Sequence, residues 1–139
     1  MSSTLLGWPG SVSTTSALTR YLGINGRGAN RATAEADVQQ TLRVAGTLRN
    51  FWTNVASNSL NGTSTLRIRK DAANGNGVLS ISAAATGEFL DAVNTDDFTA
   101  GQKASISLVT EGSSGTLAQN STTVEYDAAV HTARMVGSA

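Results

Sequence analysis

The amino-acid sequence predicts an all-β fold, namely an antiparallel β-sandwich or jelly roll of about eight strands with an extended N-terminal arm. Ser, Thr and Asn are abundant, and 14 Gly stand against a single Pro, which is typical of short strands joined by tight turns. Several short segments alternate apolar and polar residues, as in 103–110, where Ala104, Ile106 and Leu108 alternate with serines. Turn-forming residues separate these segments at spacings of roughly 8–12 residues, which favours a sandwich.

The chain divides into an arm at residues 1–15, a jelly-roll domain at 16–127 and a C-terminal tail at 128–139. The arm is rich in Ser and Thr around Leu5, Leu6 and Trp8, and it has no periodicity of its own. An exposed Trp would gain nothing, so we expect the arm to order by docking on a neighbouring subunit, with a frayed terminus as the alternative. Its removal should then leave the domain folded.

The domain is expected to consist of short strands joined by polar turns. We expect extended segments at 17–24, 41–45, 47–57, 63–70, 78–83, 87–93, 103–110 and 117–127. Residues 33–40 carry the one helix signal, although they suit the lead into a strand equally well. Gly46 is expected at a bulge or at a corner between two strands. The Gly/Asn-rich segment 71–77 is expected to be a loop.

Composition and charge exclude several classes of function. Ten acidic and ten basic side chains cancel, so the basic field that nucleic acids and membrane surfaces require is missing. The chain has no Cys, which excludes disulfides and thiolate metal sites, and no apolar run approaches the length of a membrane span. We also expect no secretory signal, because the first ten residues contain no basic segment. Much of the 40% hydrophobic content is Ala, so the core should be lean and should gain stability from an oligomer or a larger partner.

No constellation of residues predicts a reaction, a cofactor or a metal site. His131 is the single His, it lies in the tail, and no nucleophile-elbow motif accompanies it. Asp96 and Asp97 are adjacent and should point to opposite faces of a strand, which leaves a loop-bound ion as an alternative. Glu88 and Asp91 would need a sugar-binding cleft to act as a glycosidase pair. We therefore expect a protein without enzymatic activity.

Residues 43–126 resemble a recurrent jelly-roll module of tailed-bacteriophage structural proteins. The matching positions are Gly46, Leu48, Asn50 and Phe51 at the start, Asn58 and Gly62 in a turn, Asn74 to Gly77 in a loop, and Ala100-Gly101-Gln102 in a later turn. The chain departs from that pattern at Gln102, where an acidic residue is common. The resemblance implies a tumour-necrosis-factor-like jelly roll that assembles as a homotrimer.

Within that family, a short chain with an N-terminal arm is most similar to capsid decoration (cement) proteins. The resemblance therefore implies a structural virion protein on the outer capsid surface, bound to the major capsid protein. The alternative is a receptor- or glycan-binding module of a head or tail fibre. We expect the partner-binding residues to be Leu5, Leu6 and Trp8 as apolar anchors with Arg20, Arg27 and Arg31 nearby. The basic ridge of Arg67, Arg69 and Lys70 is the alternative docking surface.

Overall fold

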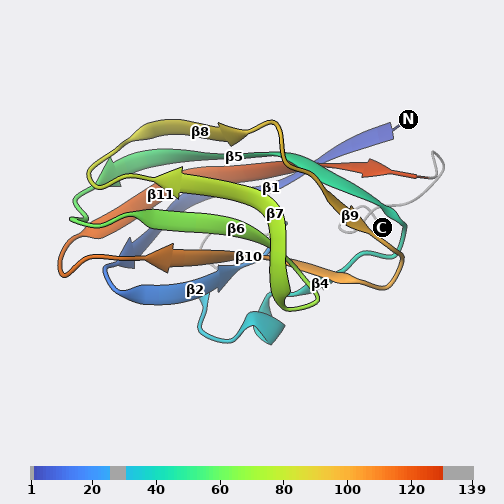
Figure 1. The fold of residues 1–139 in the computed structure, drawn as a ribbon, viewed down its shortest axis with the longest axis horizontal. Coiled ribbons are helices and arrows are strands. Elements are labelled where there is room, and N and C mark those ends of the chain that lie inside the picture. The colour runs from blue at the N-terminus through green and yellow to red at the C-terminus, as the bar shows by residue number, and fades with distance from the viewer. Residues whose placement is uncertain (1, 26–30, 130–139) are drawn as a thin grey trace.

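The computed structural model describes residues 2–25 and 31–129, which form two antiparallel β-sheets packed face to face (Figure 1). The strands of sheet A are β1 (Ser2–Thr15), β11 (Thr116–Ala128), β5 (Gly46–Asn58), β8 (Gly87–Asp91) and the short β9 (Asp96–Phe98). The strands of sheet B are β3 (Arg31–Ala32), β2 (Leu18–Leu22), β10 (Lys103–Thr110), β6 (Ser64–Lys70), β7 (Ala73–Ile81) and the short β4 (Gln40–Thr41).

The order of the strands is that of a jelly roll. Sheet A runs β1-β11-β5-β8, with β9 also paired to β5, and sheet B runs β3-β2-β10-β6-β7, with β4 also paired to β10. The chain passes repeatedly from one sheet to the other, and the final strand β11 inserts between β1 and β5. This arrangement confirms the predicted fold class of an antiparallel sandwich with eight principal strands.

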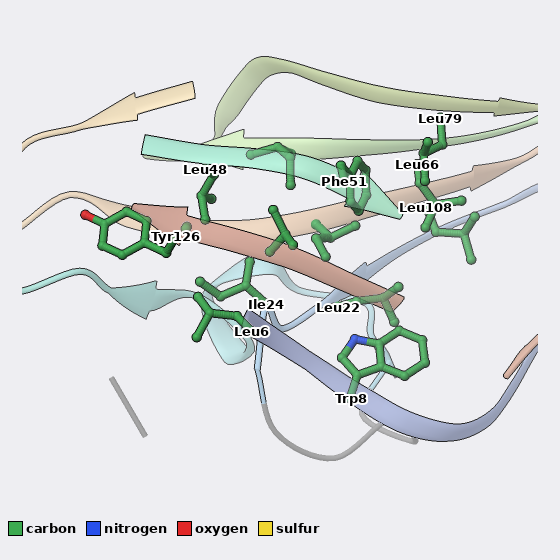
Figure 2. Close-up of a cluster of buried hydrophobic side chains, with 14 of the residues drawn as sticks. Leu6, Trp8, Leu22, Ile24, Leu48, Phe51, Leu66, Leu79, Leu108 and Tyr126 are labelled. Atoms are coloured by element: carbon green, nitrogen blue, oxygen red, sulfur yellow. The ribbon is translucent and has the colours of Figure 1, made fainter. Parts of the chain in front are cut away.

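The core lies between the two sheets and is built by the alternation that the sequence shows. Leu66 and Ile68 of β6 point inward, as do Ile106 and Leu108 of β10, and all four belong to one buried cluster with Phe51 of the opposite sheet. Figure 2 shows Leu66 and Leu108 on the side of the core that faces Phe51. Successive side chains of a strand face opposite sides, so the intervening polar residues point away from the core. Burial of Leu, Ile and Phe side chains on this scale stabilises the fold by about 1.5–3 kcal/mol for each side chain.

The expected N-terminal arm is instead a strand of the sandwich. β1 pairs with β11 along its length, from Ser2 opposite Ala128 to Thr15 opposite Thr116. The side chains of Leu6 and Trp8 are only 2% and 3% exposed, and they point into the same cluster as the core residues of sheet B (Figure 2). The expectation was wrong because polar Ser and Thr alternate with the apolar residues only over a short part of the segment.

The prediction of a loop at residues 71–77 is also wrong for most of that segment. A tight turn at Asp71 and Ala72, both with positive φ, is followed directly by β7. The glycines in this strand make room for a carboxylate, since a Cβ on Gly75 would lie 2.5 Å from Oδ1 of Asp96. The Gly/Asn composition therefore reflects a close approach between chain segments rather than a loop.

The helix signal at residues 33–40 produces only a single turn. A 3-10 helix, η1, covers Glu35–Asp37, and the chain then enters β4. Gly46 lies at the corner where the chain leaves sheet B for sheet A, as expected. No helix among the described residues has the length and apolar character needed to span a membrane.

Candidate functional site

The outer face of sheet B is partly covered by the chain itself. Ser105 and Ser107 of β10 point away from the core, yet both side chains are buried. The segment that contains η1 packs over this face, beside β2. Ser105 donates a hydrogen bond to Glu35 of η1 at 2.9 Å. Since the described residues that follow β2 close this face, sheet B offers little room for a partner over β10.

An ion pair fixes that cover to the sheet. Arg69 donates two hydrogen bonds to the Glu35 carboxylate, from Nε to Oε1 at 2.8 Å and from Nη2 to Oε2 at 3.0 Å. The Arg69 guanidinium also lies over the Tyr21 ring. The hydrogen bond from Arg69 is the main cause that holds the pKa of Glu35 below its ordinary value, despite the opposing effect of burial. This bidentate ion pair therefore holds the segment that contains η1 against sheet B.

The outer face of sheet A carries no covering element among the described residues. Its centre is Trp52 of β5, which lies between Thr123 of β11 and Leu90 of β8 in the cross-strand register. The Trp52 side chain is half-buried, whereas that of Leu90 is 58% exposed. Directly opposed residues in an antiparallel sheet have Cβ atoms about 4.5–5.5 Å apart, so these three side chains form one row.

The next row extends this apolar centre with polar groups. Asn54 follows Trp52 on the same face of β5 and lies opposite Ser121 and Glu88. We call the group formed by Trp52, Leu90, Thr123, Asn54 and Glu88 the Trp52 face. It combines one aromatic ring and one exposed leucine with an amide, a hydroxyl and a carboxylate on an open sheet surface.

A bulge in β5 places Trp52 outward. Leu48 and Phe51 both point into the core, so two residues, Arg49 and Asn50, occupy the space between them. Asn50 adopts a positive φ of 51°, a conformation that Asn tolerates better than most residues. The bulge shifts the alternation by one residue, and the Trp at position 52 consequently faces solvent.

The polar side chains beside the Trp52 face are paired with one another. Arg49 Nε lies 2.6 Å from Asp127 Oδ2, and Glu125 accepts hydrogen bonds from Asn50 and from Ser3, the latter at 3.1 Å. The bond from Asn50 is the main cause that lowers the pKa of the Glu125 carboxyl. Arg49 and Asp127 compensate each other, whereas Glu125 is bonded to neutral groups and keeps its negative charge beside the Trp52 face.

Asp96 and Asp91, two of the carboxylates that the sequence singled out, have structural roles. Asp96 is buried and accepts hydrogen bonds from the backbone N–H groups of Asn76 and Gly77, at 2.6 and 2.9 Å. Asp97 points the opposite way and is exposed, as predicted for neighbours on a strand. Asp91 is buried and bonded to backbone N–H groups, so it does not pair with Glu88 across the sheet surface. The described residues contain no group of His, Cys, Asp and Glu that would hold a metal ion.

The predicted partner-binding residues do not form one site. Leu5 is 67% exposed on the outer face of sheet A, while Leu6 and Trp8 belong to the core and cannot anchor a partner. Arg20 is half-buried on β2 and donates to its neighbour's carbonyl, Thr19 O. Arg27 lies outside the described residues, and Arg31 lies in β3 with a side chain that is outside them too.

The alternative basic ridge is occupied by contacts within the chain. Arg69 holds Glu35, and Arg67 donates to the carbonyl of Gly75. Lys70 donates to the carbonyl of Asp97, and its ammonium group lies 5.4 Å from the Phe98 ring centroid. Sequence reasoning did not select Trp52 as a site residue. The signal that could have found it is its phase, opposite to the inward Phe51, Thr53 and Val55.

Comparisons with known proteins add little to this description. No family model and no curated protein matches the chain. Among solved structures, the crystal structure of the CBM36-1 domain of a multidomain xylanase from the hindgut metagenome of Trinervitermes trinervoides is similar at 14% identity and a TM-score of 0.38. The match covers 66% of this chain and 68% of that one. At this identity and TM-score, the likeness says nothing about what this chain binds.

Proposed function

We propose that the protein is a structural docking module that decorates an assembled bacteriophage shell and binds it through the Trp52 face. The observation that carries the docking role is the row of Trp52 and the 58%-exposed Leu90 on the open side of sheet A. Aromatic residues are enriched in the centres of protein interfaces, whereas unpaired charges are depleted there. The phage shell as partner is supported by the resemblance of residues 43–126 to phage jelly-roll modules.

The arrangement of charges supports a protein surface as the partner. Arg49 is paired with Asp127, so docking would bury neither of these two charges without its partner, and Glu125 would keep the hydrogen bond from Asn50. A module that binds only the assembled shell makes the shell harder to open by mass action. The proposed location is therefore the outer surface of the virion.

A glycan-binding role is the second candidate, and the neighbours of Trp52 favour it. Asn54 and Glu88 stand one row away from the ring, on the same face. Aromatic rings pack against the apolar faces of ligands, while amide and carboxylate groups accept or donate hydrogen bonds to hydroxyls. This is the chemistry that a sugar would use, and it fits the module of a head or tail fibre.

The experiment compares the wild-type protein with Trp52→Ala and with Val109→Ala. Val109 is a half-buried residue on the outer face of sheet B, so its variant controls for a general effect of surface truncation. Binding is measured by co-sedimentation with undecorated shells of the phage that encodes the chain, and in parallel on a glycan array. We expect Trp52→Ala to weaken shell binding by at least about tenfold, or roughly 1.4 kcal/mol, and Val109→Ala to have little effect.

Each result discriminates between the candidates. Wild-type protein that fails to sediment with shells but binds glycans through Trp52 would support the fibre module and contradict the shell role. Binding to shells that is equally strong in the Trp52→Ala variant would place the docking surface elsewhere.

A further inference from the structure

Strand β1 lies at the edge of sheet A, and between Ser2 and Trp8 no second strand pairs with it in the described part of the molecule. β11 is the strand that pairs with β1 there. An edge strand presents a row of unpaired N–H and C=O groups, which is a template for another extended chain. Between Ser2 and Trp8 the register with β11 is continuous, and the irregularity in β1 begins only after Pro9.

The other long edges of the sandwich carry charged protection, whereas β1 has none between Ser2 and Trp8, and Pro9 with the irregularity after it protects only the rest of the strand. On β7, the backbone N–H groups of Asn76 and Gly77 are capped by the Asp96 carboxylate. The edge strand β8 carries Glu88 and Asp91 within five residues. By contrast, Ser2–Thr15 contains no Asp, Glu, Lys or Arg. Charged side chains are a common device against edge pairing, so their absence marks β1 as an edge that accepts a partner.

The same strand carries a projection and a depression two residues apart. The Leu5 side chain is 67% exposed on the outer face. Gly7 follows on that face, where the lack of a side chain lets β11 approach, since a Cβ there would lie 3.0 Å from Thr123 Cγ2. A shallow hollow of about 300 Å³ borders Leu5 and Gly7. The hollow is lined by Leu5, Leu6, Gly7, Trp8, Asn25, Ser121 and Thr123.

We infer that two copies of this chain pair through the free edges of β1, so that sheet A continues across a two-fold axis. The register that fits the projection and the depression sets Leu5 of each copy opposite Gly7 of the other, with the axis at Leu6. Residues directly opposite in an antiparallel pair share a face, so each leucine enters the hollow of the other copy. A two-fold axis makes such an interface self-complementary, since the same two residues serve both copies.

This inference is independent of the proposed shell binding and differs from the homotrimer that the sequence resemblance implies. When β1 of one copy pairs with β1 of a second copy, the free edges of both strands are used, so the assembly stops at two copies. β1 carries no charged side chain, so two copies of the strand would not repel each other electrostatically. The exposed Leu5 side chain is removed from solvent only if another chain covers it. A second copy supplies both the extended backbone and the leucine that fills the hollow.

The test measures the mass of the protein in solution by sedimentation or by light scattering over a dilution series. The wild-type protein should show twice the 14.3 kDa chain mass, and it should dissociate on dilution. Leu5→Lys should weaken the dimer by at least about tenfold, because a charged side chain would have to enter the hollow. The folded domain tolerates this lysine, since position 5 lies opposite Glu125 in β11.

Leu90→Lys is the matched control, because it makes the same change at another exposed leucine of sheet A, on β8. It should leave the dimer intact, and circular dichroism should show both variants folded. A wild-type protein that stays monomeric at high micromolar concentration, or that sediments as a trimer, overturns the inference. A dimer that survives Leu5→Lys, or that Leu90→Lys weakens equally, overturns it as well.

Discussion

At the scale of single residues, Asp91 joins the two sheets of the sandwich. Its carboxylate lies at the end of β8 in sheet A and accepts a hydrogen bond of 3.0 Å from Val78 N of β7 in sheet B. It also accepts bonds from the N–H groups of Val93 and Asn94 and from the Asn94 amide. Burial raises the pKa of Asp91, but these hydrogen bonds together lower it by more, so the carboxyl is more acidic than usual.

We expect Asp91→Asn to destabilise the protein at neutral pH by about 1–3 kcal/mol, because an amide NH2 would then face buried donors. A carboxyl whose pKa is lowered by folding stabilises the native state above its unfolded pKa, near 4. This stabilisation is lost as the pH falls through the lower, folded pKa. Urea unfolding at pH 7 and between pH 4 and 2 should therefore show a smaller acid loss in the variant than in the wild type.

Asp97→Asn is the control for this prediction, since Asp97 is exposed and its carboxylate accepts a hydrogen bond from the Thr47 hydroxyl. It should change the free energy of unfolding by no more than about 0.5 kcal/mol. Equal stabilities of the wild type and Asp91→Asn at pH 7 would refute the bridging role of Asp91.

At the scale of elements, β1 is part of the domain and not an appendage. Deletion of residues 2–10 removes two core side chains, Leu6 and Trp8, and uncovers the edge of β11. Loss of a buried Leu or Trp typically costs about 2–5 kcal/mol each, against a total stability of about 5–15 kcal/mol. We expect the truncated protein to lose cooperative thermal unfolding and its native circular dichroism spectrum. A native-like spectrum with a sharp melting transition would instead support a dispensable arm.

The same element shows where sequence reasoning succeeds and fails. The strands at 63–70 and 103–110 were predictable because successive inward positions, such as Leu66 and Ile68 or Ile106 and Leu108, are apolar and alternate with polar residues. In β1 the alternation is brief, and its pairing partner β11 lies more than a hundred residues away. A strand stabilised by so distant a partner leaves little local trace.

The candidate site was less predictable than the fold, for a related reason. Trp52 faces outward only because the bulge at Arg49 and Asn50 shifts the phase of β5 by one residue. The uncovered state of sheet A depends on where Glu35 and its neighbours pack, which is over sheet B. The phase of Trp52, opposite to Phe51, Thr53 and Val55, is visible in the sequence, but which sheet stays uncovered depends on residues far from position 52.

At the scale of the whole molecule, the two sheets have different roles. Sheet B is partly covered on its outer face by the segment with Glu35, and sheet A presents the Trp52 face and, at its edge, the side of β1 that faces away from β11. These two surfaces point in different directions, since the Trp52 face lies on the broad face of sheet A and β1 forms the edge of that sheet. A dimer formed through β1 would therefore display both Trp52 faces on the same side.

The most direct measurement of the central proposal is an image of a phage shell saturated with the protein, at a resolution that separates β-strands. We predict that sheet A faces the shell, with Trp52 and Leu90 in contact with the capsid protein and the segment around Glu35 turned outward. Density that places sheet B or the loop ends against the shell, with Trp52 exposed to solvent, would contradict it.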